Sequence, residues 1–183
     1  MKALLCYGLS IGGLGFIIAA VLGAYAINVS YPAGRLRMLS ALRMSVNQAE
    51  MMCKAAAHSW YEPIGTAIKT AAMLPPGMEL DMIGMTTRPG YDSSVGLVKL
   101  HWKKLFGRGR KGITLVLLGL TAAIATKTTP TFHILVAIAA LGAGIWFSIT
   151  RADNERSLLR ARADVLPELD RAFYEGRYTQ TLR

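Results

Sequence analysis

Residues 3–29 read ALLCYGLSIGGLGFIIAAVLGAYAINV, a run of 27 positions without a charged side chain. A helix needs about 20 apolar residues to cross the hydrocarbon core of a bilayer, so this run is long enough to span it with some tilt. Two further uncharged stretches, residues 112–126 and 128–150, flank Lys127. The sequence therefore predicts an all-α integral membrane protein with three transmembrane helices, the first within residues 1–29 and the others as a hairpin over residues 112–150.

The same residues leave two alternatives to this topology. Lys2 is a minimal basic start, and Ala24, Tyr25 and Ala26 have the small-x-small form of a signal-peptidase site, so a secretory signal peptide is the alternative for the first helix. The apolar run is longer than the usual core of a signal peptide, which favours the transmembrane helix. Residues 112–126 are short for a crossing, so a re-entrant hairpin is the alternative for residues 112–150.

Small residues recur along the predicted transmembrane helices at the spacing of one helix face. Helices in lipid associate mainly through close packing, because the lipid tails are as apolar as the helices themselves. We expect helix packing at Gly8, Gly12, Gly15, Ala19, Gly23, Gly119, Ala123, Ala140, Gly144 and Ser148. The pattern does not distinguish self-association from contact with another helix of this chain or with a partner protein.

Residues 30–111 form a basic connector that we expect to lie outside the membrane. Residues 31–34 contain a proline and a glycine and predict a turn, while residues 35–60 contain neither and predict a helix that Pro63 ends. A short helix is expected over residues 64–74, then turns or short extended structure over residues 75–91. Seven methionines between residues 44 and 85 favour an adaptable contact surface, with ordinary packing as the alternative.

Residues 95–106 predict a basic amphipathic helix at the membrane interface. Apolar residues recur there at three- and four-residue spacings while lysines point in other directions, and long basic side chains can reach the headgroups. Each basic residue near an anionic surface contributes on the order of 1 kcal/mol. Contacts with anionic lipid are expected from Lys99, Trp102, Lys103, Lys104, Arg108, Arg110 and Lys111. Nucleic acid is the alternative partner, but the adjoining apolar run favours lipid, so no nucleic acid is expected.

The distribution of charge predicts an orientation. Residues 30–112 carry 12 Lys and Arg against 5 Asp and Glu, whereas the N-terminus and the hairpin turn carry only Lys2 and Lys127. Because positive loops favour the cytoplasmic side, the connector is expected in the cytoplasm, with the N-terminus outside and the C-terminus cytoplasmic. Residues 151–183 hold seven Arg and six acidic residues, which predicts a charged cytoplasmic tail helix, interrupted or restarted at Pro167.

No catalytic or cofactor-binding motif accompanies this membrane pattern. The predicted spans lack acidic residues, and His133 beside the hairpin turn is expected to pack or to lie at the interface rather than to carry protons. His58 and His101 fit no familiar zinc spacing, and Cys6 and Cys53 are not expected to form a disulfide. We therefore expect no enzyme, no cofactor and no metal site, and the sequence identifies no small-molecule substrate.

These features favour a non-catalytic structural subunit of a larger assembly in the bacterial inner (cytoplasmic) membrane, such as a secretion or conjugation apparatus. Its partners would be membrane lipids and other membrane subunits, in a homo- or hetero-oligomer. The order of one helix, a large cytoplasmic connector, a two-helix hairpin and a cytoplasmic tail resembles, in topology only, the proton-driven motor subunits of the ExbB, TolQ and MotA type. That resemblance implies a motor or channel as the alternative function. A phage- or plasmid-encoded membrane component that shapes or perforates the bilayer is a third possibility.

Overall fold

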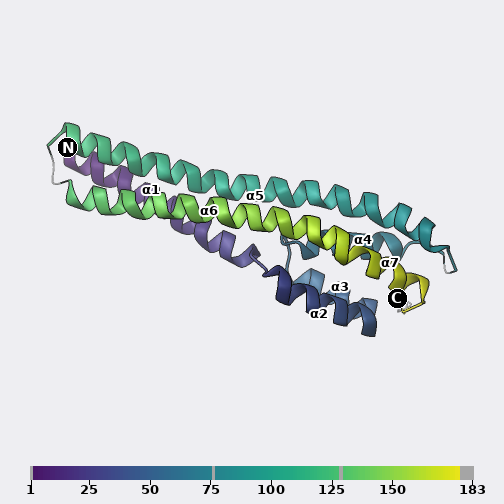
Figure 1. Ribbon diagram of the computed structural model, residues 1–183. Coiled ribbons are helices and arrows are strands. Elements are labelled where there is room, and N and C mark those ends of the chain that lie inside the picture. The colour runs from purple at the N-terminus through teal and green to yellow at the C-terminus, as the bar shows by residue number, and fades with distance from the viewer. Residues whose placement is uncertain (1, 76, 128–129, 178–183) are drawn as a thin grey trace. The chain divides into compact units, whose positions relative to one another are not determined.

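The computed structural model describes residues 2–75, 77–127 and 130–177, and within these ranges the chain forms helices and no strand. The helices are α1 (Lys2–Ile27), α2 (Tyr31–Met44), α3 (Val46–Ala55), α4 (Tyr61–Ala71), α5 (Leu80–Ala125), α6 (Thr131–Asp164) and α7 (Leu166–Tyr174) (Figure 1). The predicted all-α fold class is confirmed. The chain divides into two compact units: unit 1 is Met1–Ala26 with Trp102–Ala152, and unit 2 is Ile27–His101 with Asp153–Arg183.

The three helices of unit 1 pack through buried positions that recur at steps of three, four or, once on α6, seven residues. On α1 these positions are Cys6, Ser10, Gly13, Ile17, Ala20 and Ala24. On α5 they are Leu105, Gly109, Gly112, Val116, Gly119 and Ala123, and on α6 His133, Val136, Ala140, Phe147 and Thr150. A period of about 3.5 residues is the one with which helices wrap around each other in coiled coils. Unit 1 is therefore a three-helix bundle.

The backbones of α1 and α5 meet at two glycines in this bundle. A Cβ atom added to Gly13 would lie 2.6 Å from the carbonyl oxygen of Gly112, and one added to Gly112 would lie 2.6 Å from the carbonyl oxygen of Gly13. A Cβ added to Gly119 would overlap the hydroxyl of Ser10. Since the obstacle at residues 13 and 112 is backbone, which cannot swing aside, only glycine fits at these two positions.

Two aromatic side chains at the start of α4 organise the packing of α2 in unit 2. Trp60 and Tyr61 are both buried. Trp60 Nε1 donates a hydrogen bond of 3.2 Å to the carbonyl of Val29, and the Tyr61 hydroxyl donates one of 3.1 Å to the carbonyl of Gly34. A Cβ at Gly34 would lie 2.8 Å from each of the two aromatic side chains. Helix α2 can therefore approach α4 because residue 34 has no side chain.

Buried hydroxyl groups join α5 to α6 and α7 in unit 2. The Thr87 hydroxyl donates a 2.7 Å hydrogen bond to the Asp170 carboxylate, and the Tyr91 hydroxyl donates one of 2.7 Å to the carbonyl of Leu158. Burial raises the pKa of Asp170, while the hydrogen bond from Thr87 and the charge of Arg88 act in the opposite direction. These bonds satisfy polar groups that would otherwise be costly to bury.

Two prolines of the connector, expected to interrupt helices, stand in the first turns of helices instead. Helix α2 begins at Tyr31 and holds Pro32 in its first turn, and α4 likewise holds Pro63 in its first turn. Proline lacks an N–H group, and the N–H groups of a first turn have no partner within the helix, so proline costs little there. The predicted turn at residues 31–34 is wrong, and so is the helix end at Pro63. The helix predicted over residues 35–60 is two helices, because Ser45 adopts an extended backbone conformation.

The stretch predicted as turns over residues 75–91 is also mostly helical. Helix α5 begins at Leu80 and continues through Pro89, so the interfacial helix expected at residues 95–106 is one part of a longer helix. Burial of Ile83, Thr87 and Tyr91 on one face supports the helix on both sides of the proline. Pro76 lies outside the described residues.

The C-terminal prediction agrees with the structure over the part that is described. Helix α6 continues from the third predicted span to Asp164, and Pro167 stands in the first turn of α7. Residues 128 and 129 of the predicted hairpin turn and residues 178–183 of the predicted tail lie outside the described residues.

Two helices, α1 and α6, are long and apolar enough to cross a membrane. Helix α5 is not among them, since the uncharged part of α5 that follows Lys111 ends at Ala125 and spans about 21 Å. The hydrocarbon core of a bilayer is about 30 Å thick. A third crossing stays a prediction, because it requires basic side chains at the ends of this segment to reach into the headgroup layers.

The neighbouring residues Gly12 and Gly13 allow a matched test of the bundle. Gly13→Leu should destabilise the protein by about 2 kcal/mol or more, because the new side chain meets the backbone of α5. Gly12→Leu should destabilise the protein far less than Gly13→Leu, since no atom of the described residues lies within 4 Å of its added Cβ and leucine is a better helix former. Thermal unfolding followed by circular dichroism in detergent measures both, and equal destabilisation by the two variants would contradict the packing described here.

Candidate membrane interface

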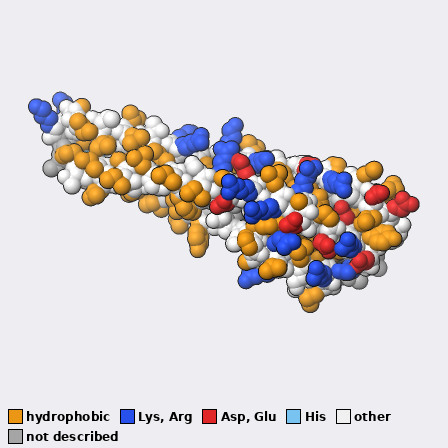
Figure 2. All heavy atoms as spheres, in the orientation of Figure 1, with side chains coloured by type: hydrophobic (Ala, Val, Ile, Leu, Met, Phe, Trp, Pro, Cys, Tyr) orange, Lys and Arg blue, Asp and Glu red, His pale blue; other side chains and the backbone are white. Residues whose placement is uncertain are grey.

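Unit 1 exposes large apolar side chains on all three of its helices. Exposed fractions reach 76% for Leu4 on α1, 61% for Ile124 on α5 and 65% for Ile145 on α6. The buried positions hold many small residues, together with the polar side chains of Ser10 and His133. In Figure 2 hydrophobic side chains cover much of the visible surface of this unit. Soluble monomers rarely expose apolar surface on this scale, which makes the outer surface of unit 1 the candidate site of interaction.

The small-residue stripe predicted on α1 lies mainly on the exposed side of that helix. No atom stands within 4 Å of a Cβ added to Gly8, Gly12 or Gly15, and Ala19 is exposed. Each of these positions is two residues beyond a buried one, a rotation of about 200° around the helix. Gly23 is the exception, because its added Cβ would lie 2.6 Å from Leu105 Cδ1. Contact of this stripe with a partner chain stays a prediction.

The predicted packing residues of the hairpin divide between the interior and the surface of unit 1. Gly119, Ala123 and Ala140 are buried in the bundle, and a Cβ added to Gly144 would lie 3.1 Å from an atom of Ile113. Ser148 is exposed.

Sequence reasoning missed the glycines at positions 13, 109 and 112. On α1, Gly13 belongs to a face that recurs with a period of about 3.5 residues. This face carries Cys, Ser, Gly, Ile and Ala in turn, so it is less conspicuous in the sequence than the glycine stripe.

Six of the seven residues predicted to contact anionic lipid are exposed. They are Lys99, Lys103, Lys104, Arg108, Arg110 and Lys111. Trp102 differs, since its side chain is only 2% exposed and therefore packs inside the chain rather than against lipid. The amphipathic pattern placed Trp102 correctly on the apolar face of its helix, but that face is covered by protein. Blue side chains next to orange ones in Figure 2 show how basic groups adjoin the apolar surface.

A polar pair is buried inside unit 1, between α1 and α6. The Ser10 hydroxyl and His133 Nδ1 share a hydrogen bond of 2.8 Å, and both residues are 0% exposed. The ring of Tyr7 lies 4.8 Å from the imidazole, centroid to centroid. His133 Nε2 has no hydrogen-bond partner among the described residues. His133 thus packs in the bundle, one of the two places expected from the sequence, whereas Ser10 carried no recognisable signal.

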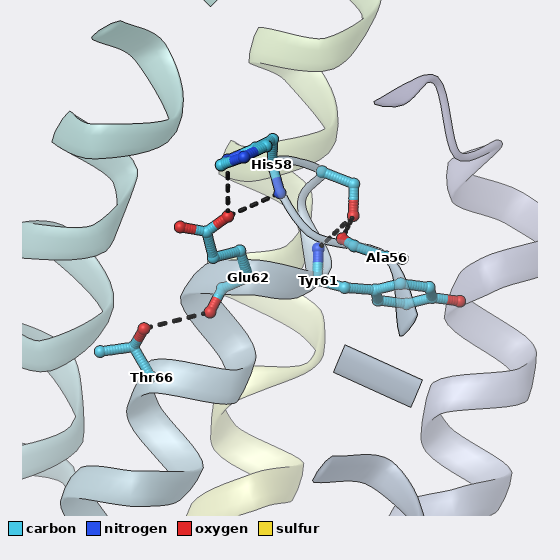
Figure 3. Close-up of polar contacts among 6 residues, drawn as sticks. Ala56, His58, Tyr61, Glu62 and Thr66 are labelled. Carbon is cyan, nitrogen blue, oxygen red and sulfur yellow. Dashed lines mark hydrogen bonds and ion pairs between the residues drawn. The ribbon is translucent and has the colours of Figure 1, made fainter. Parts of the chain in front are cut away.

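A second polar cluster forms the turn between α3 and α4 in unit 2 (Figure 3). The Glu62 carboxylate accepts a 2.6 Å hydrogen bond from the backbone N–H of His58 and lies 3.2 Å from its Nδ1. His58 has a φ of 61°, so these contacts hold a non-glycine residue in the left-handed region. The His58 ring also stacks on His101 at 3.9 Å. The cluster therefore stabilises the turn, and no set of three metal-ligating side chains occurs in the described ranges.

The thiol of Cys53 lines a cavity of about 340 Å³ beside this turn. Its side chain is buried, and burial, with a smaller effect of the Glu50 charge, raises its pKa from 9.0 to about 12. A Cβ added to Gly65 would lie 2.8 Å from Cys53 Cβ, so α3 and α4 pack closely at this point. Cys53 thus behaves as a small apolar residue of the core rather than as a nucleophile.

The raised pKa predicts slow alkylation of Cys53. At pH 8 the thiolate fraction is about a thousandfold lower than for an ordinary thiol, and the thiolate is the form that reacts. In a Cys6→Ser background, N-ethylmaleimide should label Cys53 within minutes only after denaturation, as followed by intact mass. A cysteine introduced at Met51, which is 63% exposed on the same helix, is the control and should react at once in the native protein. Equal rates at the two positions would refute this prediction.

The site is not shared with a recognised relative. Comparisons with models of protein families, with curated proteins and with solved structures find no match to this chain. Its function must therefore be inferred from the apolar outer surface of unit 1, the exposed glycine stripe and the basic residues beside them.

Proposed function

We propose that the chain is an integral membrane protein whose unit 1 lies in the bilayer. The observation that carries this proposal is the outer surface of unit 1, on which many leucine and isoleucine side chains are exposed while many of the buried positions hold small residues. Each Å² of apolar surface that leucine side chains expose to water costs a free energy of about 25 cal/mol, and this cost disappears when the surface contacts hydrocarbon. Helical backbone satisfies its own hydrogen bonds, so such a bundle can be surrounded by lipid.

The charges of unit 1 support an orientation. Unit 1 contains no Asp or Glu, and its basic residues fall into two groups. Lys2 and Lys127 belong to the same end of the bundle. Cys6, one turn after Lys2, lies beside Thr126, which precedes Lys127, at 3.7 Å between Sγ and Oγ1. The other group comprises Lys103, Lys104, Arg108, Arg110, Lys111 and Arg151. The more basic end is the one expected on the cytoplasmic side, with α1 starting outside, and a bacterial inner membrane is the setting that we propose.

Within the membrane the protein serves as a non-catalytic structural subunit of a larger assembly, such as a secretion or conjugation apparatus. This role is supported by the face that Gly8, Gly12 and Gly15 share on α1, against which none of the described residues packs. Another helix can approach such a face closely enough for favourable van der Waals contact. The exposed methionines of unit 2, Met44, Met51, Met73, Met82 and Met85, offer adaptable apolar contacts for a partner outside the bilayer.

The mass of the intact particle tests this role. The full-length protein extracted in mild detergent should run as a homo- or hetero-oligomer by mass photometry, with partners identified by mass spectrometry. Gly12→Leu combined with Gly15→Leu should shift the particle to the monomer mass, because the leucines close the α1 face. Leu118→Ala, on the exposed apolar surface of α5, is the control and should leave the mass unchanged. A wild-type protein that is already a lone monomer would refute the proposal.

A second candidate function is that of a proton-driven motor or channel subunit, which the buried Ser10 and His133 pair favours. A titratable side chain inside a membrane bundle is a usual element of proton pathways. In reconstituted vesicles, this function predicts proton flux that His133→Gln reduces about tenfold or more, while Thr121→Val leaves it unchanged. Flux that is absent from the wild type, or unaffected by the change at residue 133, would exclude this candidate.

A further inference from the structure

A small cavity opens between α5 and α6 at the basic end of unit 1. Its volume is about 50 Å³, and it is lined by Phe106, Arg110, Ile113, Gly144, Phe147, Ser148 and Arg151. Arg110 comes from α5 and Arg151 from α6, so two guanidinium groups from different helices border one opening. Both arginines are exposed and stand where the uncharged stretches of their helices end. The cavity thus lies at the boundary between charged and apolar surface.

The apolar wall of this cavity is rigidly packed. The Phe147 ring lies 5.7 Å from the Phe106 ring, centroid to centroid, in an edge-to-face arrangement. On its other side the Phe147 ring lies against Gly109, where an added Cβ would be 2.5 Å from its nearest carbon. Gly144 also lines the cavity, and a Cβ added to it would lie 3.1 Å from Ile113 Cδ1. The cavity is therefore built from fixed elements rather than from loose surface side chains.

The charge around the cavity selects an anion. Arg110 makes no ion pair with any residue in the described ranges, and Lys103, Lys104, Arg108 and Lys111 lie on the same helix. The acidic residues of α6 begin at Asp153, after Arg151, so basic side chains outnumber acidic ones around the cavity. Guanidinium groups bind phosphate oxygens through paired, charge-assisted hydrogen bonds. Ser148 also lines the opening; its hydroxyl donates to the carbonyl of Gly144 at 3.1 Å, and its proton can rotate to a phosphate oxygen by giving up that bond.

The surface next to the cavity indicates what carries this phosphate. Ile145 and Ile149, on the same helix as Arg151, are 65% and 56% exposed. Hydrocarbon chains attached to the phosphate would lie along this surface, whereas a soluble phosphate compound would leave it bare. A headgroup that also carries an ammonium ion would place that ion near two guanidinium groups, which is unfavourable. Anionic phospholipids lack this ammonium group.

On these grounds we infer that the cavity between α5 and α6 is a specific binding site for an anionic phospholipid, with Arg110 and Arg151 holding its phosphate. This inference rests on the proposed placement of unit 1 in the bilayer. It goes further than a general attraction of basic residues to an anionic leaflet, because only the two arginines at the cavity should discriminate between lipids. The neighbouring Arg108 and Lys103 are exposed on α5 but do not line the cavity.

Native mass spectrometry of the full-length protein in mild detergent tests the site. Wild-type protein titrated with phosphatidylglycerol should retain one tightly bound lipid, and phosphatidylcholine should be bound about tenfold more weakly. Arg110→Gln with Arg151→Gln should lower the phosphatidylglycerol affinity about tenfold or more, because both charge-assisted contacts are lost. The matched control, Lys103→Gln with Arg108→Gln, removes the same charge but only the diffuse attraction to anionic lipid, so it should lower the affinity several-fold less than the cavity variant does.

Each outcome bears on the inference. Equal losses in the cavity variant and the control would overturn it in favour of diffuse electrostatic attraction, and so would equal binding of the two lipids. Displacement of the lipid by inorganic phosphate alone would overturn the lipid assignment. Replacing both arginines by lysine should give an intermediate affinity if the planar guanidinium matters. Circular dichroism of every variant shows that it is folded.

Flotation with vesicles after an alkaline wash separates this inference from the proposed function. Wild-type protein that does not float would contradict its placement in the membrane. Protein that floats, but shows no lipid preference at Arg110 and Arg151, would contradict only the specific site.

Discussion

The close approach of α1 and α5 at Gly13 and Gly112 is the constraint on which the rest of unit 1 depends. At this point the two backbones leave no space for a side chain. The contact fixes the axial register of the two helices, which in turn sets Ser10 beside Gly119 and brings Ile17 to the central apolar cluster. In lipid, where burying apolar surface gives little driving force between helices, such fits of shape supply much of the attraction. The buried hydrogen bond between Ser10 and His133 adds a directional contact that the apolar packing lacks.

Unit 2 is held together by a different set of interactions. Aromatic rings at Trp60 and Tyr61 fill the space that Gly34 leaves, and hydroxyl groups of Thr87 and Tyr91 satisfy acceptors on neighbouring helices. This is the ordinary chemistry of a protein core in water, where burial of apolar and aromatic surface dominates. The two units therefore differ in their outer surfaces: unit 1 has no acidic side chain and exposes many leucine and isoleucine side chains, whereas unit 2 carries all the acidic residues of the chain.

How far the sequence predicts this structure depends on the physical signal in each segment. The all-helical class followed from long uncharged runs and from helix-forming residues, and the restart of the chain at Pro167 followed from the chemistry of proline. Pro32, Pro63 and Pro89 were misjudged, since whether a proline ends a helix depends on its place in the first turn and on packing that only the folded chain reveals. The exposed basic residues were predictable one at a time. Their grouping with Arg151 and Phe147 around a cavity was not, because it requires the register of α5 against α6.

The meeting of Gly13 with Gly112 also has a consequence for biosynthesis. The two residues are separated by almost a hundred positions, and ribosomes add about 5–20 residues per second, so α1 emerges roughly 5–20 s before its partner helix. During this interval the α1 seam has no complementary surface, and Ser10 depends on the backbone of its own helix for a hydrogen bond. The contact between the two helices can therefore form only after most of the chain has been made, so the order in which the helices emerge is part of how the bundle assembles.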